Sequence, residues 1–170
     1  MKKLIATLFT AFIVASGFAA DKVGNPYAKY TEKLPFPMPE VTAPVIPDNQ
    51  VNLKDFGAVG DGITLNTEAF AKAIDTLSAQ GGGKLVVPAG VWFTGPIQLK
   101  SNNNLHLKVG AVILFSGDDK LYPIIKTSFE GLDTRRCQSP LSANGCENIA
   151  ITGHGVIDGN GQYWRPVKKS

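Results

Sequence analysis

Apolar residues follow a helical period in one short stretch after residue 66. The apolar positions that would share one helix face are Ala69, Phe70, Ala73, Ile74 and Leu77. Asn66 or Thr67 is a suitable N-cap, Glu68 in the first turn favours the helix dipole, and Gly81–Gly83 ends the helix. The sequence therefore predicts one short amphipathic helix whose apolar face must be covered by other elements.

The remaining apolar residues alternate with polar ones as in strands, and these strands repeat. Leu85–Trp92 aligns with Leu105–Val112 at an offset of 20 residues. Asn104–Leu107 aligns with Asn148–Ile151 at an offset of 44 residues, which is two units of 22. A repeat of this length with two short strands per unit is typical of a solenoid, with coils about 4.8 Å apart. We expect an all-β fold, a right-handed single-stranded parallel β-helix capped by the helix, with asparagines stacked at one corner; a β-sandwich is the alternative.

The chain divides into four predicted segments. Residues 1–19 read as a signal peptide, because Lys2 and Lys3 precede an apolar run and small residues allow cleavage after Ala19. That run is shorter than the roughly 20 residues that a membrane span needs. The other segments are a Pro-rich extended arm (20–50), the N-terminal part of a β-helix domain (51–166) and a truncated tail (167–170). Residues 118–142 match no coil, and we expect them to loop out from the stack.

Composition and charge narrow the function classes. The chain has 170 residues, 44% of them hydrophobic, and a formal net charge of +3. Since two of the lysines belong to the predicted signal peptide, little positive charge remains for a nucleic-acid partner. Cys137 and Cys146 either form a disulfide after export or remain thiols, and the sequence leaves both open. With His106 and His154 they show no metal-ligand spacing, so no metal and no cofactor is expected.

Several motifs carry a resemblance to known proteins over residues 51–166. The segment Asp55–Gly62, with the helix start and the glycines after it, resembles the N-terminal motif of pectate-lyase-like β-helix proteins. The early coils of family 28 polygalacturonases are similar to Ser139–Leu141, Asn148–Gly153 and Gly155–Gly161, followed by Tyr163-Trp164. The resemblance implies hydrolysis of α-1,4-galacturonan or rhamnogalacturonan with inversion, by one carboxylic acid and one carboxylate base.

Three segments imitate the catalytic motifs of family 28, which are Asn-Thr-Asp, Asp-Asp, Gly-His-Gly and Arg-Ile-Lys. They are Asn66-Thr67-Glu68, Asp118-Asp119 and Gly153-His154-Gly155. An inverting pair lies about 6.5–9.5 Å apart and so must come from neighbouring coils. Separations of 50 and 36 residues do not match one coil, and Arg-Ile-Lys is absent. We therefore assign no catalytic residue, and expect helix capping at residues 66–68 and solvated turn carboxylates at 118–119.

Five further residues have two interpretations each. Asp158 resembles an acid but is expected to bind turn amides. Arg135 and Arg136 could bind a uronate carboxylate or form a solvated pair in a loop. Trp92 and Trp164 could be sugar platforms or packed aromatics.

The resemblance makes the expected function that of an N-terminal fragment of an exported pectin-degrading hydrolase. Family members are several hundred residues long with catalytic coils in the middle, so we expect this chain alone to be an incomplete solenoid, inactive and poorly folded. The expected partner of the whole protein is an acidic plant polysaccharide such as pectin, and the protein is expected to be a monomer in the periplasm or the medium. The alternatives are a non-catalytic carbohydrate-binding or tailspike-like module, and a lyase or epimerase of the same fold.

Overall fold

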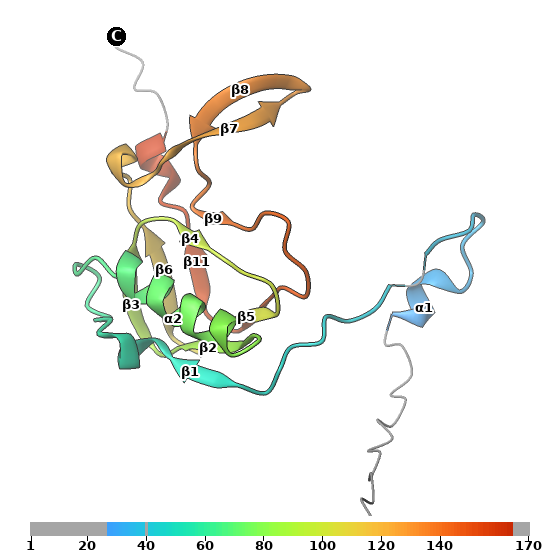
Figure 1. Cartoon of the computed structure of the whole chain (residues 1–170), viewed down its shortest axis with the longest axis horizontal. Helices are drawn as coiled ribbons and strands as arrows, with labels where there is room; N and C mark the ends of the chain where they lie inside the picture. The colour runs from blue at the N-terminus through green and yellow to red at the C-terminus, as the bar shows by residue number, and fades with distance from the viewer. Residues whose placement is uncertain (1–26, 40, 165–170) are drawn as a thin grey trace, which may run out of the picture. The chain divides into compact units, whose positions relative to one another are not determined.

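The computed structural model describes residues 27–39 and 41–164 (Figure 1). The described residues fall into two units, which divide between Ala43 and Pro44. In the first, helix α1 (Ala28–Thr31) interrupts the predicted arm, which is therefore not extended throughout. The predicted signal peptide with its cleavage after Ala19, and the tail 167–170, lie outside the described residues. Within those ranges, no helix is long and apolar enough to cross a membrane.

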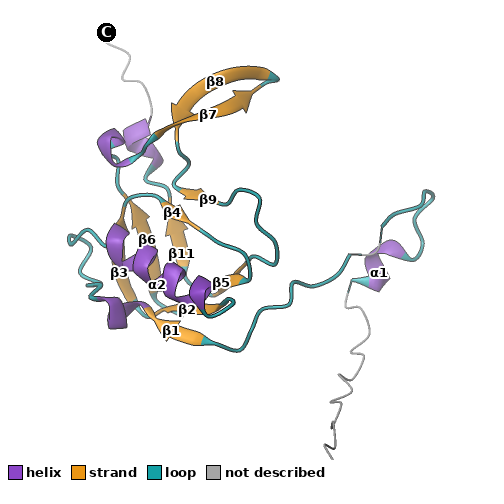
Figure 2. Cartoon of the chain, viewed as in Figure 1, coloured by secondary structure: helices purple, strands orange, loops and turns teal. Residues whose placement is uncertain are grey.

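The second unit consists mostly of short strands with one longer helix (Figure 2). Its parallel strands are β1 (Gln50–Asn52), β2 (Gly83–Val87), β3 (Gly90–Thr94), β4 (Ile97–Gln98), β5 (Asn103–Leu107), β6 (Ala111–Phe115), β9 (Leu141–Ser142), β10 (Ala150–Gly153) and β11 (Val156–Asp158). The other elements are helix α2 (Thr67–Ala79), the hairpin strands β7 (Ile124–Phe129) and β8 (Leu132–Cys137), and the 3₁₀ turns η1 (Leu53–Phe56), η2 (Asp119–Leu121) and η3 (Gly161–Trp164).

The parallel strands form three stacks, which confirms the predicted parallel β-helix. One sheet has the order β1-β2-β5-β10, a second β3-β6-β11, and a third pairs β4 with β9. Successive coils of the chain thus stack their strands in the same sheets. The inward rows, such as Leu85 beside Leu105 and Trp92 beside Ile113, are buried at 0–1% exposure. The antiparallel sheets that a β-sandwich requires are not found among these strands.

The register corrects the predicted repeat in two places. Leu85 pairs with Leu105, so the offset of 20 holds for β2 and β5. Trp92 pairs with Ile113 rather than with Val112, because the turn before β6 is one residue longer than the turn before β3. Ile151 pairs directly with Leu105, so β10 lies one coil beyond β5 and not two. The long spacing comes from a single coil that carries an insertion.

That insertion is a β-hairpin and not the predicted irregular loop. Strands β7 and β8 pair antiparallel from Ile124↔Cys137 to Phe129↔Leu132 and stand clear of the stack in Figure 1. Glu130 and Gly131 form the two-residue turn with φ of 53° and 82°, as the common hairpin turns require. The end of the segment predicted to loop out, Leu141–Ser142, has already rejoined the stack as β9.

The glycines of the Asp55–Gly62 motif act in two different ways. Gly57 and Gly62 have φ of 81° and 78°, which makes them turn glycines. Gly60 is not in the left-handed region. Instead, a Cβ on Gly60 would lie 3.0 Å from the Trp92 ring, so this glycine leaves room for the buried indole.

Helix α2 buries the five predicted apolar residues, but the predicted side-chain cap is wrong. The Asn66 side chain makes no hydrogen bond to the first turn of the helix, and only its backbone carbonyl accepts one, from Phe70 N–H at 3.0 Å. Its side chain is 2% exposed and binds the loop before the helix, while Thr67 Oγ1 accepts from Gly95 N–H at 2.7 Å. Both side chains therefore attach the start of the helix to the coils, whereas the sequence alone predicted that they would cap the helix.

Asparagines are stacked at the corner before β5 and β10, but the partner of Asn148 is Asn102 and not Asn104, with which the 44-residue offset aligned it. Asn102 and Asn148 both have positive φ, at 61° and 52°. Asn148 Nδ2 donates to Asn102 Oδ1 at 3.1 Å, and Asn102 Nδ2 donates to Gly81 O at 3.2 Å. In each of these coils one asparagine side chain thus donates a hydrogen bond to an oxygen at the corner of the neighbouring coil.

Replacing Gly82 with alanine is expected to destabilise the chain more than replacing its neighbour Gly81. Both have positive φ, so an alanine costs about 1 kcal/mol of backbone strain at either position. A Cβ on Gly82 would also collide with the backbone and Cβ of Asn102, whereas nothing lies within 4 Å of a Cβ on Gly81. Urea unfolding of the two variants checks this, and equal midpoints would contradict the close approach of the two coils.

Candidate functional site

A large hollow on the second unit lies between the hairpin and η3. Its volume is about 780 Å³. The residues that give it chemical character are Ile124, Ile125, Arg135, Arg136, Pro140 and Trp164. We call this hollow the hairpin groove. Its lining combines apolar residues, two arginines and a tryptophan, the mixture found in pockets for small polar ligands.

The two arginines of the hairpin groove are available for an anion. Among residues 27–39 and 41–164 the ion pairs are Lys72 with Glu68 and Lys100 with Asp75, so neither Arg135 nor Arg136 is engaged in one. The guanidinium carbon of Arg136 lies 4.2 Å from the centroid of the Phe129 ring. Stacking on an aromatic face orients a guanidinium and leaves its edge N–H groups free to donate.

Only one of the two tryptophans, Trp164, is exposed. Trp92 is fully buried, and its Nε1 donates to Pro88 O at 2.8 Å, so it belongs to the core. Trp164 is 38% exposed and lines the hairpin groove. Its ring meets Tyr122 edge-to-face with centroids 5.0 Å apart, and the Tyr122 hydroxyl donates to Ser116 O at 2.7 Å. Trp164 is thus supported from behind by a fixed ring.

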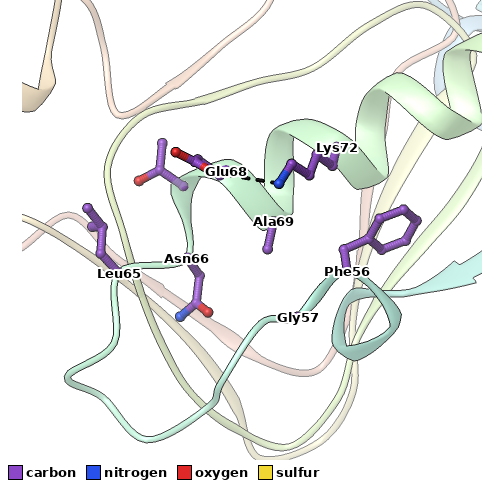
Figure 3. Close-up of a pocket in the computed structure, with 8 residues that line it drawn as sticks. Phe56, Gly57, Leu65, Asn66, Glu68, Ala69 and Lys72 are labelled. Carbon is purple, nitrogen blue, oxygen red and sulfur yellow. Dashed lines mark ion pairs between the residues drawn. The ribbon is translucent and has the colours of Figure 1, made fainter.

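A second hollow of about 310 Å³ lies at the start of α2 and contains Glu68 (Figure 3). Glu68 Oε2 lies 3.6 Å from Lys72 Nζ, and the Glu68 side chain is 91% exposed. Asn66 also borders this hollow, but its amide is used by the backbone. Glu68 is the only carboxylate of the lining, whereas inverting hydrolysis requires two.

The other two imitated motifs lie apart from Glu68. Asp118 precedes η2, and its Oδ1 accepts from Lys120 N–H at 3.1 Å. His154 lies in the turn between β10 and β11, where its backbone N–H donates to Leu107 O at 3.0 Å. Within the described part of the chain, no hydrogen bond or ion pair joins the side chains of Glu68, Asp118 and His154. Asp158 accepts from Asn160 N–H at 2.8 Å and so forms the turn expected for it.

One polar chain on the outer face of β5 and β10 was not predicted from the sequence. His106 Nδ1 lies 2.8 Å from Thr152 Oγ1, which donates to Asn104 Oδ1 at 2.8 Å. Burial lowers the pKa of His106, and the charges of Lys108, Lys84 and His154 lower it further. The pairing of Thr152 with His106 depends on the corrected register, which the repeat alone did not provide.

The cysteines are both free thiols in this structure. Cys137 lines the hairpin groove, whereas Cys146 Sγ donates to Asn144 O at 3.2 Å in the next loop. Over the ranges 27–39 and 41–164, no group of three or more His, Cys, Asp or Glu side chains is arranged to hold a metal ion.

The chain is similar to a known protein family and to several of its members. A family model described as "Rhamnogalacturonase A/epimerase, pectate lyase-like" matches residues 50–135. A probable polygalacturonase of Vitis vinifera is 42% identical over 125 residues, which are 68% of this chain and 26% of that protein. An exo-poly-alpha-D-galacturonosidase of Dickeya chrysanthemi is 40% identical over 119 residues, which are 65% of this chain and 19% of that protein.

A solved structure agrees with these sequence matches. The hyperthermoactive exopolygalacturonase from Thermotoga maritima is 52% identical, with a TM-score of 0.66 over 69% of this chain and 26% of that one. The chain thus spans 19–26% of the length of these three relatives.

Proposed function

Because the chain belongs to the pectate-lyase-like family of rhamnogalacturonase A and epimerases, we propose that it serves as the N-terminal part of an exported pectin-degrading glycoside hydrolase. The activity proposed for the whole protein is hydrolysis of galacturonan linkages with inversion. In that protein the described coils support the substrate and do not supply the acid and the base. Pectin, or its galacturonan backbone, is the proposed substrate, and the periplasm or the medium the proposed location.

One observation carries this proposal. The match to an exopolygalacturonase of known structure, at 52% identity, extends over both the sequence and the coil geometry of this chain. Two further relatives with galacturonan-cleaving names match at 40% and 42% identity. Identity at this level on a shared fold supports a shared substrate class more strongly than the fold alone does.

An epimerase is the second candidate, because the family description includes that activity. Polygalacturonate treated with the host-produced protein is expected to yield new reducing ends without the ultraviolet absorbance of an unsaturated sugar. An epimerase would change the uronate composition and leave the chain length unaltered, and a lyase would generate the absorbance. Either result would replace the proposed hydrolase.

The purified 170-residue chain is expected to release no reducing ends from polygalacturonate. The reason is chemical: Glu68 is ion-paired on α2, Asp118 caps η2, and neither has a second carboxylate arranged with it as inversion requires. A reducing-end assay against a buffer blank measures this. Turnover that survives repurification, and that a Glu68→Gln or Asp118→Asn substitution abolishes, would show that an acid and base were overlooked.

A further inference from the structure

The hairpin of β7 and β8 is a two-stranded sheet with open edges, and it extends away from the parallel strands (Figure 1). Among residues 27–39 and 41–164, β7 pairs with β8 and with no other strand, and every residue of β7 is exposed. An isolated hairpin is marginally stable in water, and an open edge offers unpaired N–H and C=O groups to another strand. β8 carries Asp133 and two arginines, and charges on an edge strand oppose further pairing. β7 carries one charged residue, Lys126, so it is the edge suited to a further strand.

The backbone of β7 presents its free hydrogen-bonding groups at alternate residues. Gln138 N–H donates to Pro123 O at 2.8 Å, so these two residues are a hydrogen-bonded pair at the base of the hairpin. Such pairs recur at every second residue of an antiparallel ladder, so Thr127 binds β8 in the same way. The N–H and C=O groups of Lys126 and Ser128 therefore point away from β8, toward the open edge.

One face of the hairpin is largely apolar and uncovered. Successive residues of a strand point to opposite faces, so Ile125, Thr127 and Phe129 share one face. Leu132 lies on the same face, directly across from Phe129. Ile125, Phe129 and Leu132 are 40%, 49% and 72% exposed. The Arg136 guanidinium carbon, 4.2 Å from the centroid of the Phe129 ring, covers only part of this face.

A second copy of β7 fits this edge in one register. An antiparallel pairing centred on Thr127 places Ile125 opposite Phe129 of the second copy, so apolar side chains meet on the shared face. The same register places Lys126 opposite Ser128 of the second copy, where their free N–H and C=O groups bind one another. The neighbouring register, centred on Lys126, would place two lysines directly opposite each other, which is unfavourable.

The charges of the hairpin also fit a second copy. Within one hairpin Lys126 lies directly across from Arg135, which is a repulsive pair. Neither side chain forms an ion pair with a residue that the structure describes. In the register centred on Thr127, Ser128 of the second copy lies next to Lys126, and Asp133 of that copy follows in the same row. A lysine side chain is long enough to extend past the serine toward that carboxylate, so two copies gain an attraction that one hairpin lacks.

We propose that β7 is a dimerisation site, at which two copies of this protein pair their β7 strands antiparallel about Thr127 into one four-stranded sheet. The dimer departs from the monomer expected from the sequence, and it does not depend on the proposed hydrolase activity. Because six residues per copy make a small interface, the dimer is expected to dissociate on dilution.

Cysteine cross-linking of the protein as its host produces it tests the register. In a background with Cys137→Ser and Cys146→Ser, Thr127→Cys is expected to form a disulfide between two copies on mild oxidation. The reason is that opposed residues of a non-hydrogen-bonded pair have Cα atoms about 4.5 Å apart, which a disulfide can bridge. Ser128→Cys is the matched control, because in this register the two copies of residue 128 lie about 8 Å apart, beyond the reach of a disulfide.

Sedimentation of the same protein measures the dimer directly. Ser128→Pro removes an N–H from the open edge of β7 and is expected to raise the dissociation constant of the dimer by at least about tenfold. Arg135→Pro is the control, because Arg135 lies across from Lys126 and its N–H therefore points to the opposite edge, away from β7. This variant is expected to retain the dimer.

Three results would overturn the proposed dimer. They are a protein that stays monomeric up to about 100 μM, equal dissociation constants for the two proline variants, and cross-linking through residue 128 as readily as through residue 127. Slow hydrogen exchange of the β7 edge amides in a monomeric protein would also overturn it, since another segment of the same chain would then pair with β7.

Discussion

Replacing Asn66 with alanine is expected to lower the free energy of unfolding by about 3–5 kcal/mol, because each buried polar group left without a partner costs about 1–3 kcal/mol. The Asn66 side chain accepts from Val59 N–H at 2.8 Å. Its amide group donates to the carbonyls of Val59, Thr64 and Phe93 at 3.0, 2.8 and 3.1 Å. Alanine leaves the Val59 N–H and the Val59 and Thr64 carbonyls without these bonds.

The matched control for this experiment is Asn52→Ala. Asn52 accepts one hydrogen bond, from Lys54 N–H at 3.0 Å, at an exposed turn. Its loss is expected to cost about 1 kcal/mol, as for an ordinary cap. Urea unfolding followed by circular dichroism gives both values, with protease resistance as the readout for a variant that is unfolded without denaturant. Equal effects of the two substitutions would show that Asn66 has no special role.

Replacing Trp92 with alanine is expected to cost about 3–5 kcal/mol through the cavity that it leaves. Trp92 is fully buried in the inward row of β3 and stacks on Ile113 in the next coil. The substitution also removes the donor to Pro88 O and the ring against which Gly60 packs. The same urea experiment measures the loss.

Trp164→Ala is the control for size and aromaticity, because Trp164 is 38% exposed and contacts Tyr122 at the surface. Its effect on stability is expected to be about 1 kcal/mol. A larger loss for Trp164 than for Trp92 would mean that the core is centred on η3 and not between the parallel sheets.

The coil architecture was predictable because stacked strands repeat their apolar positions. Leu85 and Leu105 show the period directly, and their pairing is as expected. The hairpin hid the next coil, since it added residues between β6 and β9 and made one coil look like two. The Glu130-Gly131 turn between two alternating runs was the signal that would have identified it.

The roles of single polar residues were less predictable than the coils. Asn66 has the right type and place for a helix cap, yet its partners Val59 and Phe93 come from the loop and from β3. Sequence spacing says nothing about such contacts between separate turns of the chain. Likewise, Trp164 lines the same hollow as the hairpin strands because of how the hairpin and η3 meet, which only the folded chain shows.

Proton NMR of a trigalacturonate digest tests the central claim, hydrolysis of galacturonan with inversion, most directly. The host-produced protein is expected to release saturated sugars whose new reducing end appears first as the β-anomer, because inversion reverses an α-linkage. Signals of a double bond in the sugar ring, an α-anomer formed first, or an unchanged trimer would contradict the account.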